Sequence, residues 1–92
     1  MLVRWTAEAR SDLVRLHAFL AAVNPQAAAR AVQRLRGVPE RLLMDHPRLG
    51  SRLDQFAPRE VRRLFVDDYE LRYEIQKDTI FVTNLWHTRE DR

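Results

Sequence analysis

The chain has 92 residues, of which 46% are hydrophobic and 32% are charged. This length suits one domain with a single core, and the balance is that of a globular chain rather than a disordered one. Cysteine is absent, which excludes disulfides and thiolate metal sites, and no apolar run reaches the roughly 20 residues that cross a bilayer. We therefore expect one domain over residues 1–92, located in the cytoplasm.

The net charge of +3 is carried almost entirely by arginine, which supplies all but one of the 16 basic residues. Between residues 48 and 63, five arginines stand against two carboxylates. A mild positive excess of this kind suits nucleic acid or an acidic protein partner, and it does not separate the two.

The first elements are a short strand and a helix. Residues 2–5 predict a strand rather than a signal peptide. Thr6 is a good helix N-cap, and apolar residues then recur at helical spacing. This stripe consists of Leu13, Leu16, Leu20 and Val23. The pair Asn24-Pro25 ends this helix and starts the next one, because asparagine caps well and proline is favourable at the first helical position.

The second helix is predicted from another apolar stripe. It consists of Ala27, Ala31, Leu35, Val38 and Leu42. Pro39 lacks a backbone donor, and its ring clashes with the carbonyl group four residues earlier. We therefore expect a kink or a break, with helical segments near 25–36 and 39–44. Residues 51–59 are expected to form an irregular loop.

The region from Glu60 to His87 predicts three consecutive strands of an antiparallel meander. Apolar and polar residues alternate without a break from Tyr69 to Gln76, which is the period of a strand with one buried face. The pairs Asp67-Asp68 and Lys77-Asp78 are expected to form two-residue turns. The whole chain is then an α+β domain, with a helical hairpin on one face of a small antiparallel β-sheet (β-α-α-β-β-β).

Two-residue turns fix the register of the meander, and the register sorts the side chains onto two faces. In the first hairpin Arg63 faces Arg72, and in the second Tyr69 faces Trp86. The predicted core face consists of Leu64, Val66, Tyr69, Leu71, Tyr73, Ile75, Ile80, Val82 and Trp86. The other face is mixed, and it consists of Val61, Arg63, Phe65, Glu70, Arg72, Glu74, Phe81, Thr83, Leu85 and His87.

Six short motifs, in this order and spacing, resemble the RelE/ParE superfamily of toxins from type II toxin–antitoxin systems. They are Trp5–Ala9, Asn24–Ala28, His46–Gly50, Val61–Leu64, Tyr69–Tyr73 and Leu85–Asp91. The resemblance covers nearly the whole chain and is strongest to ParE-type plasmid-stabilisation proteins, in which a helical hairpin packs on an antiparallel sheet.

The resemblance implies a small toxin held inactive by a cognate antitoxin encoded beside it. ParE-like members inhibit DNA gyrase, whereas RelE-like members cut mRNA on the ribosome, and the shared fold does not decide between them. Our leading hypothesis is a ParE-like, non-enzymatic gyrase inhibitor. The alternatives are a RelE-like ribosome-dependent mRNA endonuclease and a non-toxic binding module. No cofactor is implied, and the three histidines show no metal-ligand spacing.

If the chain is a ribonuclease, it needs a base, a cation and an acid around one phosphate. RelE-like sites resemble a patch of basic and proton-transferring side chains on the sheet. The candidates here are Arg63, Arg72, His87 and Arg89. Two departures weigh against this activity, because Glu70 stands where ribonuclease relatives carry arginine and Thr88 where they carry tyrosine. The arginines also suit a solvated face, and His87 suits a hydrogen-bonded structural role.

A partner-binding surface is predicted on the mixed face. Phe65, Phe81 and Leu85 are large apolar side chains on the side without helices, and a domain of this size has nothing of its own to cover them. With Arg62 and Arg63 they suit an antitoxin segment that docks as a helix or as an added strand, giving a hetero-oligomer. Dimerisation is the other explanation.

Overall fold

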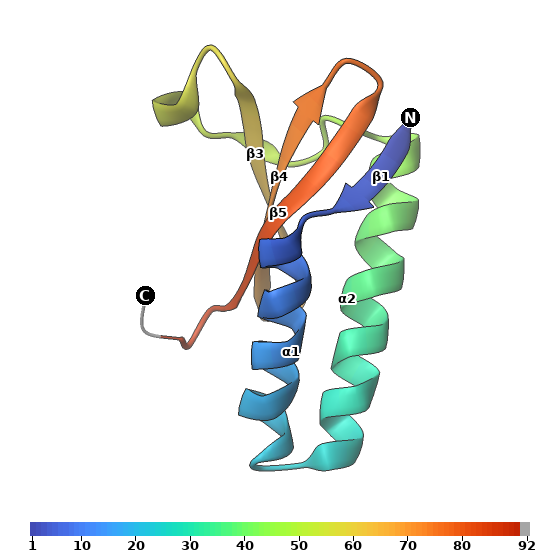
Figure 1. Cartoon of the computed structure of the whole chain (residues 1–92), viewed down its shortest axis with the longest axis vertical. Helices are drawn as coiled ribbons and strands as arrows, with labels where there is room; N and C mark the ends of the chain where they lie inside the picture. Colours follow the sequence, from blue (N-terminus) through green and yellow to red (C-terminus); the bar gives the residue numbers. More distant parts are fainter. Residues whose placement is uncertain (91–92) are drawn as a thin grey trace.

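In the computed structural model, which describes residues 1–90, two helices pack on one face of a five-stranded sheet (Figure 1). The predicted element order and the α+β class are confirmed. The bounds are β1 Leu2–Trp5, α1 Ala7–Ala21, α2 Pro25–Asp45, β2 Ser51–Arg52, the 3₁₀ turn η1 Asp54–Phe56, β3 Glu60–Val66, β4 Tyr69–Gln76 and β5 Thr79–His87. The motif that ends at Asp91 extends one residue beyond the described part.

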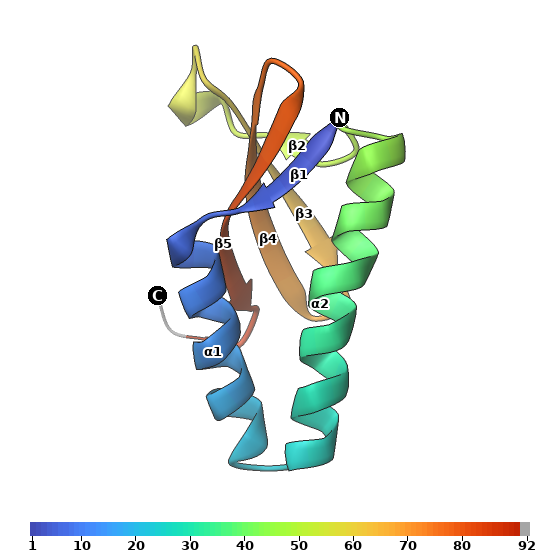
Figure 2. The ribbon, with the colours of Figure 1, turned by 45° about the vertical axis from the view of Figure 1, so that its right-hand side comes forward.

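The sheet is mixed rather than purely antiparallel. Its strands lie in the order β1-β5-β4-β3-β2, and β1 runs parallel to β5. The prediction of an antiparallel sheet is therefore wrong at this edge. The meander reverses direction twice, so that β5 points the same way as β3, and β1 joins β5 at the edge before the chain enters α1. Figure 2 shows the helical hairpin along one face, with α1 beside the end of β5.

Both helices begin where the sequence predicts. The hydroxyl oxygen of Thr6 accepts the Ala9 N–H at 3.1 Å, and the side-chain oxygen of Asn24 accepts the Ala27 N–H at 3.1 Å. Each cap satisfies one of the backbone donors that the first turn of a helix leaves unpaired. Pro25 occupies the first position of α2, where its missing N–H is not needed.

Helix α2 runs without interruption from Pro25 to Asp45, so the predicted break at Pro39 is wrong. Pro39 is buried on the side of α2 that faces the core, and Leu35 and Leu43 lie one turn before and one turn after it. Burial of this apolar stripe offsets the hydrogen bond that the proline ring removes.

The buried residues of both helices differ in part from the predicted stripes. Val23 lies beyond the end of α1 and is 90% exposed, although Leu13 and Leu16 are buried as expected. In α2 the buried set is displaced from most of the predicted stripe by one residue, and it consists of Ala28, Leu35, Pro39 and Leu43.

Both predicted two-residue turns are confirmed. Their first residues, Asp67 and Lys77, have φ angles of 54° and 56°, so both turns use the left-handed region without a glycine. The register of β3 against β4 is also as predicted, because Arg63 pairs with Arg72.

The register of β4 against β5 is confirmed only in the first half of the hairpin. Tyr73 pairs with Val82 as expected, but the next pair is Arg72 with Asn84, so Thr83 is an extra residue in a β-bulge. The Thr83 hydroxyl donates to the Arg72 carbonyl oxygen at 3.2 Å, which holds the bulge on the β4 side.

After the bulge, the side chains of β5 lie on the opposite faces of the sheet from those predicted. Tyr69 pairs with His87 rather than with Trp86. Leu85 and His87 therefore face the helices, and Trp86 faces the opposite side. The predicted faces of these three residues are wrong, because one inserted residue moves every later side chain to the other face.

The segment between α2 and β3 has more structure than the predicted irregular loop. Within residues 51–59, Ser51 and Arg52 pair with β3, and η1 follows. Just before it, the buried Gly50 lies so close to β3 that a Cβ atom would stand 2.6 Å from the carbonyl oxygen of Arg63. Only glycine allows this approach of two backbones.

The Tyr73 hydroxyl ties this segment to the sheet. It accepts the Gly50 N–H at 2.9 Å and donates to the Pro47 carbonyl oxygen at 2.9 Å. Burial raises the pKa of Tyr73, so the hydroxyl keeps the proton that it donates.

The core lies between the helices and the sheet. It consists of Ala9, Leu13, Leu16, Leu35, Leu43, Tyr69, Leu71, Tyr73, Ile75, Ile80, Val82 and Leu85. The predicted core residue Leu64 is partly buried against this cluster.

Candidate partner-binding surfaces

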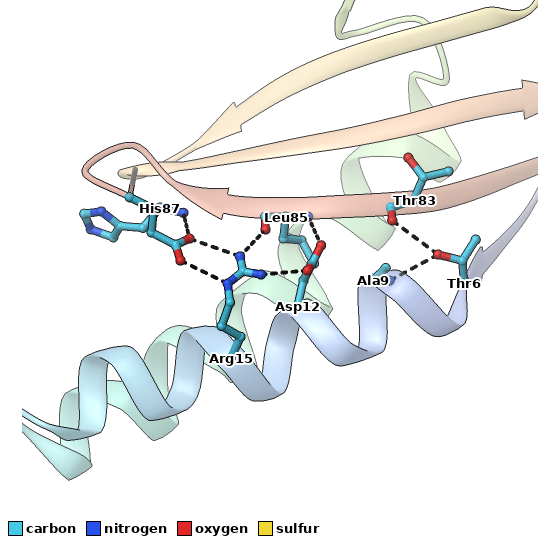
Figure 3. Close-up of polar contacts among 8 residues, drawn as sticks. Thr6, Ala9, Asp12, Arg15, Thr83, Leu85 and His87 are labelled. Carbon is cyan, nitrogen blue, oxygen red and sulfur yellow. Dashed lines mark hydrogen bonds and ion pairs between the residues drawn. The ribbon is translucent and has the colours of Figure 1, made fainter. Parts of the chain in front are cut away.

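The free edge of β5 is closed by side chains of α1 (Figure 3). Strand β1 pairs only with residues 79–82, so the rest of β5 has no strand partner on that side. Asp12 accepts the Leu85 N–H at 2.9 Å, and Arg15 donates to the Leu85 carbonyl oxygen at 2.8 Å. Helix α1 therefore takes the place of an edge strand, and this half of the edge is not open for strand addition.

Arg15 also fixes the chain that follows β5. Its guanidinium binds Asp12 at 2.7 Å and both carboxylate oxygens of Glu90 at 3.0 Å. Glu90 in turn accepts the His87 N–H at 2.9 Å. The C-terminal segment up to Glu90 is thereby bound to α1.

His87 is buried between the end of β5 and α1. Its ring centroid lies 5.0 Å from that of Tyr69, edge to face, and 5.6 Å from that of Phe19. The Nδ1 atom accepts the Arg89 N–H at 3.0 Å. These contacts are those of a hydrogen-bonded structural histidine, and the predicted position on the mixed face is wrong.

The face of the sheet away from the helices, which we call the outer face, carries alternating arginine and aromatic side chains. The guanidinium carbon of Arg72 lies 4.8 Å from the Trp86 ring and 5.4 Å from the Phe56 ring, and that of Arg59 lies 6.0 Å from the Phe56 ring. We call these four residues the outer-face stack. Phe56 belongs to η1, so these cation–π contacts hold the turn against the outer face. Figure 1 shows the turn on the side of β3 away from the helices.

Buried carboxylates lie in the same layer. Arg59 binds the buried Glu74 at 2.5 Å, and this hydrogen bond lowers the pKa of Glu74 despite its burial. Glu70 is also buried, and Arg72 lies 3.8 Å from it. The outer face therefore combines ion pairs and cation–π contacts with buried apolar side chains such as Val61.

The four candidate catalytic residues do not converge on one site. Arg63 and Arg72 lie side by side on the outer face, whereas His87 faces the helices. Arg89 is exposed beyond the end of β5. Arg72 is engaged in the outer-face stack, so Arg63 is the one member of the set that is exposed on the outer face.

The predicted partner-binding residues are also separated. Phe65 is 55% exposed, with the guanidinium carbon of Arg63 5.4 Å from its ring, and the half-buried Phe81 lies on the same face. Leu85, in contrast, is fully buried under α1. The prediction that Leu85 joins Phe65 and Phe81 is wrong, because the bulge turns it inward.

Arg62 is not available to a partner either. Its side chain donates to the Gly50 carbonyl oxygen at 2.7 Å and to Glu60 at 2.9 Å. Burial raises the pKa of Glu60, but hydrogen bonds from Arg48 and Arg62 outweigh it and lower the pKa overall. Arg62 therefore stabilises the turn before β2, and the expectation that it contacts a partner is not supported by this geometry.

A groove that the sequence pattern did not predict lies between α1, α2 and β1. We call it the apolar groove; its volume is about 410 Å³, and its lining consists of Trp5, Arg10, Leu13, Val14, His17, Val32 and Arg36. Val14 is 73% exposed there. Only Val14, which lies beside the α1 stripe, could have indicated this groove from the sequence. A single exposed valine is common on protein surfaces, so it does not predict a groove unless its neighbours on α2 and β1 are known.

Two features are absent from residues 1–90. No group of three or more histidine, aspartate or glutamate side chains in this range is arranged to hold a metal ion. Neither helix in the same range combines the length and apolarity needed to cross a bilayer.

Comparisons with known proteins agree with this architecture. The model of the family described as ParE toxin of type II toxin-antitoxin system, parDE, matches residues 3–92. A solved structure described as the chromosomal ParDE TA system from P. aeruginosa is similar, with a TM-score of 0.75, 20% sequence identity and coverage of 95% of this chain and 95% of that chain. At this identity the likeness establishes the fold. No curated protein matches the sequence.

Proposed function

Since the chain belongs to the ParE toxin family of type II toxin–antitoxin systems, we propose that it inhibits DNA gyrase by binding the enzyme rather than by cutting nucleic acid. The family membership makes it the toxin of such a pair and implies an antitoxin partner. We place its action in the cytoplasm, where gyrase and its DNA are found.

One observation carries the preference for binding over cleavage. The histidine that would transfer a proton is buried against Tyr69 and Phe19, with its Nδ1 occupied by the Arg89 N–H. Arg63 and Arg72 lie on the other side of the sheet, so His87 and these cations cannot act on one phosphate. A ribonuclease built on this set would need the end of β5 to refold.

The test is the supercoiling of relaxed plasmid by purified gyrase. We expect the isolated chain to inhibit supercoiling at near-stoichiometric amounts and the antitoxin-bound chain to have no effect. Normal supercoiling at a large excess of the free chain rejects the proposal. In parallel, mRNA on stalled ribosomes should stay intact, and cleavage that disappears in Arg63→Ala would show the RelE-like activity instead.

For the antitoxin we propose the apolar groove as the docking site. Its lining includes the apolar residues Trp5, Leu13 and Val32, and Arg10 and Arg36 contribute positive charge. This combination fits the apolar face of an amphipathic segment with acidic residues along its edges. The outer-face residues Phe65, Phe81 and Arg63 stay a prediction for a partner surface.

A matched pair of substitutions separates the two surfaces. Val14 and Phe65 are both exposed apolar residues, one in the apolar groove and one on the outer face. We expect Val14→Glu to abolish co-purification with the cognate antitoxin and Phe65→Glu to preserve it. The reverse result places the antitoxin on the outer face.

A further inference from the structure

A second groove lies on α2 beside the β3–β4 turn. We call it the arginine groove; its volume is about 350 Å³, and its lining consists of Arg30, Gln33, Arg34, Gly37, Val38 and Arg41. It contains three arginines and a single large apolar side chain, whereas the apolar groove contains Trp5, Leu13, Val14 and Val32. The two grooves share helix α2 and both contain arginine, but only the apolar groove offers several large apolar side chains.

The arginines of this groove form one line along the helix. Arg34 and Arg41 follow Arg30 by four and eleven residues, a spacing that keeps all three on one face of a 3.6-residue helix. Gly37 lies between them, and a Cβ atom there would stand 3.2 Å from the Nη1 atom of Arg41. The missing side chain therefore lets the Arg41 guanidinium fold back over the helix and into the groove, although glycine is unfavourable in a helix interior.

Most of this charge is not neutralised within the described residues. Neither Arg30 nor Arg41 forms an ion pair with a carboxylate of residues 1–90. Arg34 binds Asp67 at 2.9 and 3.2 Å, and both side chains are about half exposed. Exposed pairs of this kind are weak and exchange readily for another anion. The other carboxylates in this part of α2 are Glu40 and Asp45.

We infer that the arginine groove binds the phosphate backbone of nucleic acid. Planar guanidinium groups suit bidentate contacts with phosphate oxygens, and a line of them suits a repeating anion. An acidic protein segment fits less well, because the groove offers only Val38 as an apolar anchor and stable protein contacts depend on such anchors. Binding through phosphates alone is independent of base sequence.

The inference is tested by fluorescence anisotropy with a labelled DNA duplex and the purified chain, at increasing NaCl concentration. Three phosphate contacts predict that log Kobs falls with log[NaCl] with a slope of about −3. Arg30→Gln and Arg41→Gln should each reduce the steepness of the slope by about one and weaken binding several-fold. Arg36→Gln is the matched control, since it removes the same charge from the same helix but lies in the apolar groove.

A gain of affinity is expected from Asp67→Asn. The substitution releases Arg34 and removes a negative charge, and asparagine tolerates the positive φ of this turn position as well as aspartate does. Binding should tighten several-fold with a slope still near −3, because Arg34 is already one of the three phosphate contacts. An unchanged affinity would overturn the role of Arg34 and, with it, the groove.

Three other results would also overturn the inference. The first is that the duplex does not bind at low salt. The second is that Arg36→Gln and Arg30→Gln lose the same affinity for the duplex, which would mean that net charge alone, and not the groove, accounts for binding. The third is displacement of the duplex by poly-glutamate at equal charge concentration, which would assign the groove to an acidic protein. Gyrase is absent from the assay, so this inference and the proposed gyrase inhibition fail independently.

Discussion

Strand β4 presents two different chemistries to its two sides. Toward the helices it directs Leu71, Tyr73 and Ile75, all buried against the leucines of α1 and α2. Toward the outer face it directs Arg72, which lies between Glu70 and Glu74 in the strand. The 3₁₀ turn η1 covers part of this face through Phe56. The same eight residues are thus held on one side by apolar packing and on the other by ion pairs and cation–π contacts.

The difference predicts which conditions each face responds to. Apolar burial depends little on ionic strength, whereas ion pairs at partly exposed positions weaken as salt screens them or as acid neutralises their carboxylates. Substitutions on the helix-covered face should therefore change global stability in every buffer. Substitutions on the outer face should cause smaller losses that depend on salt or pH.

The largest effect is expected from Leu71→Ala on the helix-covered face. Leu71 is fully buried, so the loss of its side chain and the cavity left behind should lower the free energy of unfolding by about 2–5 kcal/mol. Urea unfolding at low and high NaCl should give the same loss. Phe65→Ala on the outer face is the comparison, and a loss within about 0.5 kcal/mol is expected there because Phe65 is exposed. Equal losses would contradict the division between the faces.

A smaller effect is expected from Tyr73→Phe. The substitution keeps the ring in the core but removes the hydroxyl that joins Gly50 to Pro47. The buried Gly50 N–H would then lack its acceptor, at a cost of about 1–3 kcal/mol. Urea unfolding measures this loss, and amide exchange of residues 47–52 should increase more than that of α1. An unchanged stability would show that the tether is not needed.

Local rules were enough to predict much of this fold from sequence. Thr6 and Asn24 cap the two helices through their own side chains. The alternation along β4 and the turn that begins at Asp67 set the β3–β4 register. These features depend on residues within a few positions of each other, which is why the pattern alone identifies them.

The errors came from contacts between distant parts of the chain. The bulge at Thr83 lies where Thr6 donates a hydrogen bond to the Thr83 carbonyl oxygen and where α1 replaces β1 beside β5. The sequence of residues 79–87 gives no sign of this bulge. The bulge nevertheless moved Leu85, Trp86 and His87 to the opposite faces of the sheet, and Leu85 is therefore not part of the predicted surface. The continuation of α2 through Pro39 was also missed, because the prediction did not take into account that Pro39 is buried between Leu35 and Leu43.

On the outer face, Arg72→Lys should have a modest effect. Lysine keeps the charge but lacks the planar guanidinium that lies against both Phe56 and Trp86, so we expect a loss of about 0.5–2 kcal/mol. Amide exchange of residues 54–57 should increase, because η1 is held through Phe56. The control is Arg63→Lys, whose guanidinium contacts the Phe65 ring on an exposed surface. An equal loss in both variants would show that the stack does not hold the turn.

The smallest effect, and the one most specific to the outer face, concerns pH and Glu74. The hydrogen bond from Arg59 is the main reason that the pKa of Glu74 lies below its ordinary value in the folded chain. A carboxylate with a lowered folded-state pKa contributes stability above its unfolded pKa of about 4.3, and this contribution is lost as pH falls through the folded pKa. Glu74→Gln should therefore be less stable than the unmodified chain at neutral pH, and urea unfolding should show the two converging in acid. Leu71→Ala should show the same deficit across this range, and a pH-independent deficit for Glu74→Gln would mean that packing rather than charge holds the outer face.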